Sequence, residues 1–330
     1  MNKLEIGKLS NEELKNYVLK NITVNRDEVL FGADIGVDTA VLDFKDNLIV
    51  ASTDPITGAT NDIGKLAINV SCNDIACECA EPVGVLISVL LPPNATLDEL
   101  DAIIKDASRE CEKLNLNIVG GHTEVTDAVN RIVVTTTVLG KVKRELLPKI
   151  NRIESGDVIA ISKYIGIEGT CIAYNERKNE LDKILSKKDK IEICSMSEML
   201  SVVNESKIAK DYNVKFMHDI TEGGLYGALW ESSNVIKKAI EIDKNLVPIK
   251  NSTKKISKIF DIDVFRFISS GSMIFIFSKE DFLEFKLKCE KNNILITEIG
   301  IIKEGSDLLI KGENREVVLE ATVDELYKIV

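Results

Sequence analysis

The sequence has few of the residues on which several common kinds of functional site depend. Its 330 residues include two histidines and one tryptophan, and its seven cysteines form no Cys-x-x-Cys pair, so a typical zinc centre is not expected. No apolar run is long enough to span a bilayer. Basic residues form only brief clusters in a chain of net charge −11, which disfavours a nucleic-acid partner and an anionic membrane surface.

The cysteines are best interpreted as small buried hydrophobic residues. Their number is odd and the sequence shows no signal peptide, which fits the reducing cytosol, so we expect a cytoplasmic protein. Cys72, Cys77 and Cys79 are close together in the sequence, but their neighbours are apolar or acidic. A reactive thiolate needs positively charged surroundings, so a redox or zinc role is the less favoured alternative.

Length and hydrophobic periodicity predict an α+β protein of two domains. The seam is expected between Pro148 and Gly156, because a fresh apolar strand begins at Asp157. The predicted domains are therefore residues 1–150 and 151–330. The predicted helices are 9–20 (with Ser10 as N-cap), 62–80, 96–114, 169–176, 196–211 and 223–234, and the predicted strands are 39–44, 48–52, 83–91, 116–119, 131–142, 157–162, 214–217, 239–242, 272–277 and 294–301.

Three aspartates of the first half lie in turn-prone segments. They are Asp38, which follows Gly36-Val37, Asp54 before Pro55, and Asp74 after Asn73. If strands 39–44 and 48–52 form a hairpin, Asp38 and Asp54 return to the same end of a sheet. Because Mg²⁺ is bound by a few carboxylates together with phosphate oxygens, this arrangement predicts a magnesium–phosphate site and nucleotide chemistry.

The helix predicted after Asp62 has an amide-rich stripe. Lys65, Asn69 and Asn73 share one side of it, which suits a ligand-facing wall better than a solvated charged face. Asp74 falls among the apolar positions, where an unpartnered carboxylate is costly. Either the helix ends before Asp74, or a metal ion or a buried partner holds this side chain, and we favour the metal.

Two glycine pairs mark further candidate positions. Gly120-Gly121 is expected to form a turn, and the histidine that follows, His122, either packs in that turn or contacts a ligand. In the second half, a strand end leads into Gly223-Gly224 and then a helix. Asp219 and Glu222 near this helix start could cap the helix, contact a ligand, or do both.

Familiar nucleotide and hydrolase motifs are absent from the sequence. The segment from Gly58 to Leu66 has five residues between its glycines and a leucine where a magnesium-binding hydroxyl belongs, so it is not a Walker loop. No Gly-x-Gly-x-x-Gly follows a strand and no Gly-x-Ser-x-Gly is present. Dehydrogenase and hydrolase interpretations are therefore weak.

Several short motifs nevertheless follow one another in a known family's order and spacing. They are Thr53-Asp54-Pro55, Gly64-Lys65-Leu66-Ala67, Asn73-Asp74-Ile75-Ala76, Glu81-Pro82, Gly120-Gly121-His122-Thr123-Glu124-Val125 and His218-Asp219-Ile220-Thr221-Glu222-Gly223-Gly224-Leu225. With these motifs the sequence resembles the aminoimidazole ribonucleotide (AIR) synthetase superfamily over nearly its whole length. The superfamily includes selenophosphate synthetase, thiamine-monophosphate kinase and the hydrogenase maturation dehydratase.

The resemblance implies an α+β fold of two domains, with an N-terminal domain whose strands join those of a second subunit into a barrel. It implies a homodimer that binds ATP and Mg²⁺ and transfers the γ-phosphoryl group to an oxygen of an amide or carboxamide type. The residues that match the family's positions are Asp38, Asp54, Asp74 and Asp219 for the metal, Lys65, Asn69, Gly120, Gly121, His122 and Thr123 for ATP, and His122, Asp219 and Glu222 for catalysis.

The sequence departs from each branch at particular positions. The pattern is nearest to the hydrogenase maturation dehydratase, but the chain ends Leu326-Tyr327-Lys328-Ile329-Val330 in place of that enzyme's Pro-Arg-Ile-Cys tail. His122 stands where the dehydratase usually has an acid, and Glu222 stands where it usually has arginine. Selenophosphate synthetase has a reactive cysteine or selenocysteine near its N-terminus, whereas the first cysteine here is Cys72. The acceptor, small or protein-borne, is thus left open.

A non-catalytic nucleotide-binding scaffold, regulatory or concerned with maturation, is the rival interpretation. It predicts ATP binding without turnover. The four aspartates argue against it, because a protein that only senses nucleotide has no need of a full magnesium set.

Overall fold

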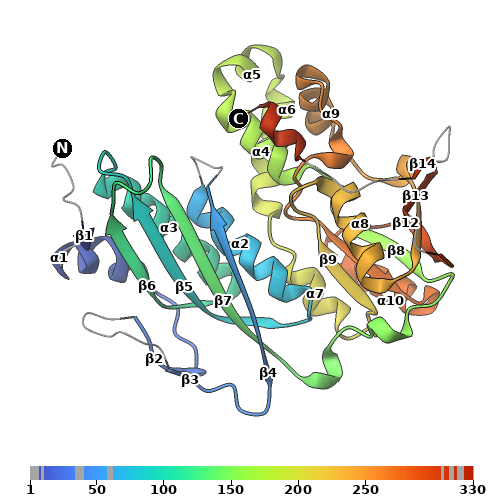
Figure 1. The fold of residues 1–330 in the computed structure, drawn as a ribbon, viewed down its shortest axis with the longest axis horizontal. Coiled ribbons are helices and arrows are strands. Elements are labelled where there is room, and N and C mark those ends of the chain that lie inside the picture. The colour runs from blue at the N-terminus through green and yellow to red at the C-terminus, as the bar shows by residue number, and fades with distance from the viewer. Residues whose placement is uncertain are drawn as a thin grey trace. The chain divides into compact units, whose positions relative to one another are not determined.

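A computed structural model describes residues 7–8, 11–33, 41–57, 62–305, 308–311, 316–317 and 323–329. The chain forms two compact units (Figure 1). Unit 1 comprises Met1–Ala76 and Ala80–Glu145, and unit 2 comprises Cys77–Cys79 and Leu146–Val330. The mixed α and β content predicted from the sequence is confirmed in both units.

Unit 1 is built on a five-stranded sheet with the order β1-β6-β5-β7-β4. The central strand β5 runs parallel to β6, and the other neighbouring pairs are antiparallel. The short strands β2 and β3 pair with each other and form a separate two-stranded sheet. The strands are β1 (Gly7–Lys8), β2 (Val29–Phe31), β3 (Val41–Leu42), β4 (Leu48–Ile56), β5 (Glu81–Leu91), β6 (Asn117–Val125) and β7 (Val133–Val142).

Two long helices cover one face of this sheet. They are α2 (Ile63–Ala76) and α3 (Leu97–Leu114), and in Figure 1 the strands lie in front of them. Thr96, the first residue of the helix predicted over 96–114, caps α3: its hydroxyl accepts the Glu99 N–H while the Glu99 carboxylate accepts the Thr96 N–H. The N-terminal segment forms α1 (Asn11–Glu13), a π-helical turn (Leu14–Val18) and a 3₁₀ turn (Leu19–Asn21) in place of the single helix expected over 9–20; Ser10, its predicted cap, is outside the described residues.

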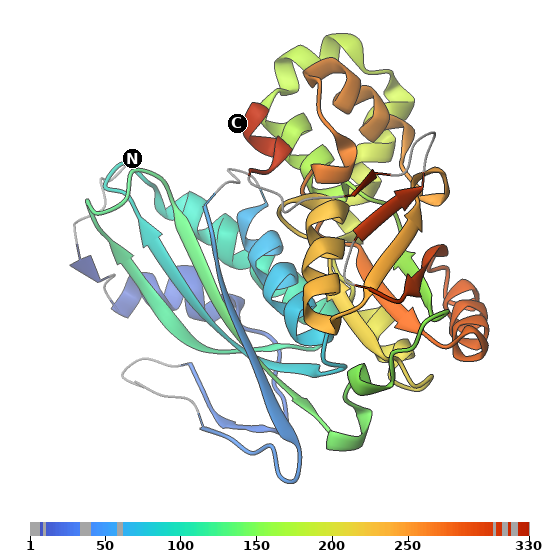
Figure 2. The ribbon, with the colours of Figure 1, turned by 45° about the vertical axis from the view of Figure 1, so that its right-hand side comes forward.

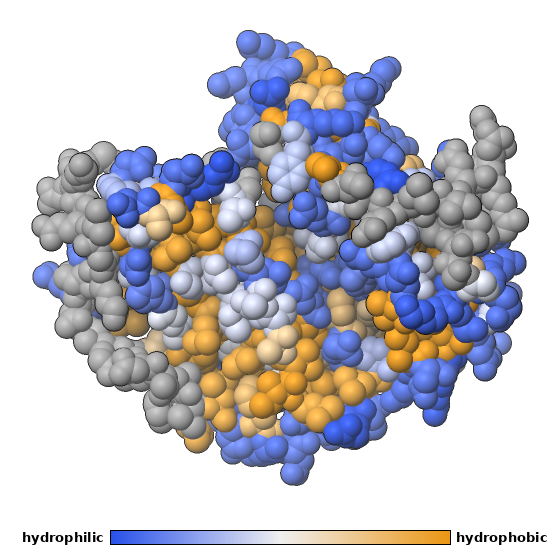
Figure 3. Space-filling view, viewed as in Figure 1, coloured by the Kyte–Doolittle hydropathy of each residue, from blue (hydrophilic) through white to orange (hydrophobic). Residues whose placement is uncertain are grey.

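Most of the other face of the sheet is open in the described part of unit 1, while Leu42 of β3 lies over its end at Gly84. Along β4 the side chains alternate, so that Ile49, Ala51 and Thr53 are exposed while Ser52 and Asp54 are half-buried on the helix side. Ile49 is 60% exposed and Leu86 of β5 is 38% exposed. Figure 3 shows hydrophobic and weakly polar residues over these strands, with few charged side chains among them.

Two predictions about unit 1 are wrong. The expected hairpin of strands 39–44 and 48–52 does not form, because β3 pairs with β2 and β4 pairs with β7 from Leu48↔Val142 to Ile56↔Val134. The long β7 offers nine partners to β4, which a two-residue β3 cannot match. The expected turn at Gly120-Gly121 is also wrong, since β6 continues through both glycines to Val125.

Unit 2 contains a seven-stranded sheet with the order β14-β13-β10-β12-β8-β11-β9. The strands β8, β10 and β11 are buried along nearly their whole length, which matches the continuous apolar runs in the sequence. The strands are β8 (Val158–Ser162), β9 (Phe216–Asp219), β10 (Ala239–Asp243), β11 (Met273–Phe277), β12 (Ile296–Lys303), β13 (Leu308–Lys311) and β14 (Glu316–Val317).

Helices cover both faces of this sheet. Alternate side chains of β11 point to opposite faces. On one face, Ile274 and Ile276 belong to the hydrophobic cluster that includes Leu225 of α8 (Gly224–Ile236). On the other face, Phe277 stacks on Phe285 of α10 (Lys279–Lys291), with ring centroids 4.7 Å apart. Figure 2 shows α8 in front of the strands.

A further group of helices has its own hydrophobic cluster, formed around Phe267. These helices are α4 (Ile167–Glu176), α5 (Lys178–Ile184), α6 (Lys187–Met196) and α9 (Asn251–Phe260). The helix predicted over 196–211 is divided into a 3₁₀ turn (Ser197–Met199) and α7 (Val203–Ala209). No helix within the described residues is long and apolar enough to cross a membrane.

Candidate functional site

The central feature of unit 1 is a pair of aspartates from two different elements. Asp54 is on the helix-facing side of β4, and Asp74 is in the last turn of α2. The Ser52 hydroxyl donates to Asp74 Oδ2, and the same hydroxyl oxygen is 3.3 Å from Asp54 Oδ2. A hydroxyl has one proton, so it can donate to one carboxylate at a time. The two acids therefore share a single donor.

Two further hydroxyl groups, those of Ser71 and Thr136, lie next to Asp54. Ser71 of α2 is 3.3 Å from Asp54 Oδ2 and 2.8 Å from the hydroxyl of Thr136, which lies opposite Asp54 on β7. Thr136 is buried and donates to the Ala67 carbonyl at 2.9 Å. Since α2 continues to Ala76, the alternative that the helix ends before Asp74 is wrong, and Asp74 has a hydroxyl partner within the fold.

The aspartate pair fits a magnesium ion that is shared with phosphate. Mg²⁺ prefers oxygen ligands and is usually held by one or two carboxylates together with water and phosphate oxygens. Within the described ranges no group of three potential metal-binding side chains is found, so Asp54 and Asp74 are the candidate metal-binding carboxylates in this part of unit 1. Asp38, the third aspartate predicted here, lies outside the described residues, and the metal roles of all these acids stay predictions.

The predicted ligand-facing stripe of α2 is mostly covered. Asn69 is only 1% exposed, and its amide donates to the Lys65 carbonyl at 2.9 Å and to Glu110 of α3 at 3.3 Å. Asn73 is fully buried and Lys65 is half-buried. The expectation of an open amide wall is thus wrong for the two asparagines, because α3 packs against this side of α2. Contacts of Lys65 and Asn69 with ATP stay predictions.

The glycine segment of β6 needs glycine for close packing. A Cβ on Gly121 would lie 1.9 Å from the Ile87 carbonyl oxygen of β5, so no other residue fits there without a shift of the backbone. Gly120 is half-buried, Thr123 is buried, and His122 is exposed on the open face, where its Nε2 is 2.8 Å from Glu124 Oε2. His122 is therefore a strand residue with a carboxylate partner, which neither of its expected turn roles anticipated.

In unit 2, Asp219 is the last residue of β9 and is 5% exposed. The Cys77 thiol donates to its Oδ1 at 3.8 Å. The α8 helix begins with Gly223 as its N-cap, and the acid that accepts the Gly223 N–H, at 2.6 Å, is Asp324. Neither Asp219 nor Glu222 makes this cap bond. Glu222 is exposed, and its carboxylate raises the pKa of Tyr327.

Glu168 and Asp324 are two of the buried acids of unit 2 that the sequence analysis missed. Burial raises the pKa of Glu168 to about 7, although its carboxylate accepts the Ser270 N–H at 3.2 Å. Burial also raises the pKa of Asp324, against the effect of the N–H groups that it accepts from Leu326, Gly223 and Ile268. The available signal was the Gly166 turn before Glu168, which makes Glu168 a first-turn residue of α4.

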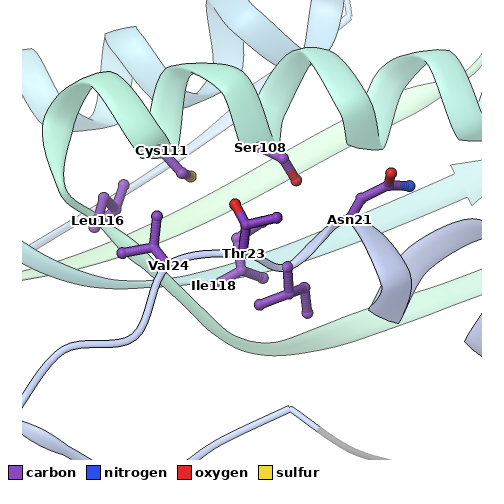
Figure 4. Close-up of a pocket in the computed structure, with 8 residues that line it drawn as sticks. Asn21, Thr23, Val24, Ser108, Cys111, Leu116 and Ile118 are labelled. Carbon is purple, nitrogen blue, oxygen red and sulfur yellow. The ribbon is translucent and has the colours of Figure 1, made fainter.

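A small pocket of unit 1 lies between α3 and the segment after Asn21 (Figure 4). Figure 4 shows Thr23, Val24 and Ile118 close beneath Ser108 and Cys111 of the helix. The space is too small to admit a water molecule, so it is a packing defect and no ligand site.

The sequence matches two family domains whose residues include this site. Residues 36–142 match the N-terminal domain of AIR synthase related protein, and residues 154–311 match the C-terminal domain. The chain belongs to the AIR synthase related family. This confirms the family that the motifs predicted.

Relatives and solved structures support the same assignment. A Methanocaldococcus jannaschii protein provisionally named as a hydrogenase expression/formation protein is 27% identical over 280 residues, which are 83% of this chain and 81% of that protein. Carbamoyl dehydratase HypE of Escherichia coli is 22% identical over 224 residues, 67% of this chain and 64% of the dehydratase. A structure of hydrogenase maturation protein HypE in complex with ATP has a TM-score of 0.80 at 18% identity and covers 98% of this chain and 97% of that one.

These similarities confirm the two-domain fold of the family. They leave the acceptor open.

Proposed function

We propose that this protein is a Mg²⁺-dependent enzyme that uses ATP to phosphorylate an oxygen of an amide or carboxamide type, on a small molecule or on a protein. The observation that supports this most directly is the Asp54–Asp74 pair, in which carboxylates from β4 and α2 share the Ser52 hydroxyl. Membership of a family with an ATP-bound structure agrees with it.

In this proposal Asp54 and Asp74 hold the metal, which when bound neutralises charge on the transferring phosphoryl group. Asp38 and Asp219 are the further predicted ligands. The acceptor oxygen forms a bond to the γ-phosphorus while the bond to the ADP oxygen breaks. His122 is the predicted catalytic residue on the opposite, open face of the same sheet, where Glu124 engages its Nε2 and leaves Nδ1 to take a proton. The predicted ATP contacts are Lys65, Asn69 and the β6 residues from Gly120 to Thr123.

We further propose that the open face of the unit 1 sheet joins the same face of a second copy, as the family resemblance implies. The argument is the exposure of Ile49 and Leu86 on a face that no helix of the described unit 1 covers. Isologous contact of two such faces would bury both and form a barrel from two half-sheets.

A non-catalytic nucleotide-binding scaffold is the alternative. His122 favours it to some extent, because a histidine replaces the acid that the dehydratase branch usually has at this position. Glu124 offers a carboxylate two residues later on the same face, which favours a retained reaction.

A screen for ADP release distinguishes the two. The protein is incubated with ATP and Mg²⁺ together with amide, amidine, thiamine phosphate or selenide acceptors, and ADP is measured over time. Acceptor-dependent ADP release that EDTA abolishes supports the enzyme. Tight ATP binding without ADP release from any acceptor class supports the scaffold and contradicts the enzyme.

A further inference from the structure

Unit 2 contains a groove between α6 and α9 that is separate from every residue discussed so far. The two helices lie side by side in Figures 1 and 2. The groove has a volume of about 410 Å³, which is within the range of small-molecule sites. Its charged lining consists of Lys188, Asp189 and Glu192 from α6 and of Lys254, Lys255 and Lys258 from α9.

The two carboxylates of the groove are used to hold it together. Asp189 accepts the Ser186 N–H at 2.9 Å and the Ser186 hydroxyl at 2.6 Å, and the Lys255 ammonium is 2.7 Å away. The Lys255 and Ser186 bonds lower the pKa of Asp189 to about 2. Glu192 accepts both the N–H and the hydroxyl of Ser252, at 2.8 and 2.7 Å, and so ties α6 to the first turn of α9.

The lysines outnumber these carboxylates by two, and three of them are open to a ligand. Lys188, Lys254 and Lys258 are exposed, and none of them forms an ion pair within the described part of the chain. Lys254 and Lys258 are four residues apart on α9, so their side chains leave the same face of the helix. A protein of net charge −11 does not attract anions in general. A cluster of positive charge within it is therefore a local feature of these two helices.

We propose that this lysine groove binds a small phosphorylated anion with at least two negative charges. Ammonium groups bind phosphate as point charges with flexible donors, which suits lysines that stay hydrated until the ligand arrives. The inference does not depend on the proposed reaction, because none of the groove residues belongs to the ATP or metal positions. A phosphorylated ligand here would be a second, regulatory or substrate-holding site of unit 2.

The exposure of the lysines determines how tightly the groove is expected to bind the anion. Exposed ion pairs are individually weak and are screened by salt, so binding should be modest and should weaken as ionic strength rises.

The test is a lysine footprint on the full-length protein with inorganic pyrophosphate as the probe. Lysines are acetylated briefly with and without pyrophosphate, at matched ionic strength set with sodium chloride, and each site is quantified by mass spectrometry. We expect acetylation of Lys188, Lys254, Lys255 and Lys258 to slow at least threefold, while Lys178 and Lys183 of α5 are unaffected. Because the readout is specific to each residue, pyrophosphate bound at the proposed ATP site does not obscure the result.

A double variant that removes two of the positive charges makes the test decisive. Lys254→Gln with Lys258→Gln should abolish the protection of Lys188 and Lys255, whereas the matched pair Lys178→Gln with Lys183→Gln should leave it intact. All four positions are exposed, so both proteins are expected to fold. Equal acetylation with and without pyrophosphate, or protection that survives in the groove variant, overturns the proposal.

Discussion

The Nε2 atom of His122 lies 2.8 Å from the Oε2 atom of Glu124, and both side chains are on the open face of the unit 1 sheet. Residues two apart on a strand share a face, so the pair follows directly from the continuation of β6 through the glycines. Glu124 thereby fixes the orientation of the ring and leaves Nδ1 for another partner.

If His122 takes the acceptor proton, His122→Ala should lower ADP release by about a hundredfold, the usual scale of general-base catalysis, with ATP affinity within twofold of the original. Glu124→Gln should give a smaller loss, since an amide can still orient the ring. Ser88→Ala, which alters the residue opposite His122 on β5, is the control. Full turnover in His122→Ala would show that His122 is not a catalytic residue.

The aspartate pair predicts that ATP binding depends on magnesium. Asp74→Asn removes one of the two negative charges beside Ser52, so calorimetry should show at least tenfold weaker ATP binding in the presence of Mg²⁺ and a loss of most of the difference that EDTA makes. Asp46→Asn, at an exposed position of the same unit, should behave as the original protein. Equal ATP affinity with and without the metal in the original protein contradicts the magnesium role.

Much of the fold could be predicted from the sequence because local signals were strong. The Thr96 capping box, the apolar run of β5 and the β-branched run of β7 each specified an element within a few residues. Asp54 and Asp74 were both predicted as ligands of one metal site, and they share a hydroxyl. The predicted hairpin was expected to bring Asp54 close to Asp38, whereas Asp54 reaches its position through pairing of β4 with β7.

What could not be predicted depends on partners that are distant in sequence. The Gly120-Gly121 pair has the composition of a turn, but the close approach of Ile87 on β5 keeps it in a strand. Asn69 and Asn73 were interpreted as a polar ligand wall because the sequence of α2 alone does not indicate that α3 packs against this side. Asp324 caps the start of α8 from 101 residues away, so no local pattern at Gly223 could have named it.

The open sheet face predicts a dimer. Leu86→Glu places a charge on that face, so light scattering at micromolar concentration should report a dimer for the original protein and a monomer for the variant. Leu287→Glu, which changes a leucine of α10 that is 58% exposed in unit 2, should leave the dimer intact. A monomer for the original protein would falsify the proposed assembly.

The pH dependence of stability should reveal the Arg26–Glu28 pair. Arg26 is nearly buried and binds Glu28 through two contacts, Nε to Oε2 at 3.0 Å and Nη2 to Oε1 at 2.9 Å, and this lowers the pKa of Glu28 to about 2. A lowered pKa adds stability above the unfolded value near 4.5, and that stability is lost as the pH falls towards 2.

Glu28→Gln should therefore lower the free energy of unfolding by about 1–3 kcal/mol at pH 7, the range for hydrogen bonds to charged groups. In urea titrations the difference from the original protein should shrink between pH 4.5 and pH 3. Glu12→Gln, at an exposed position, should show neither effect. A difference that is constant with pH would mean that packing, and not charge, is responsible.

The last prediction concerns Asp219, which is buried at the end of β9. Its Oδ1 accepts a hydrogen bond from the Cys77 thiol, with Sγ and Oδ1 3.8 Å apart. Since Asp324 caps α8, Asp219→Asn removes a charge without removing the helix cap, and the melting temperature and the dimer should be preserved. If Asp219 binds the metal–phosphate assembly, ADP release with an active acceptor should fall about a hundredfold or more, the scale seen when a preorganised charge is removed. Asp211→Asn, at an exposed position of the same unit, is the matched control. A lowered melting temperature with unchanged turnover per folded molecule would instead make Asp219 a structural residue.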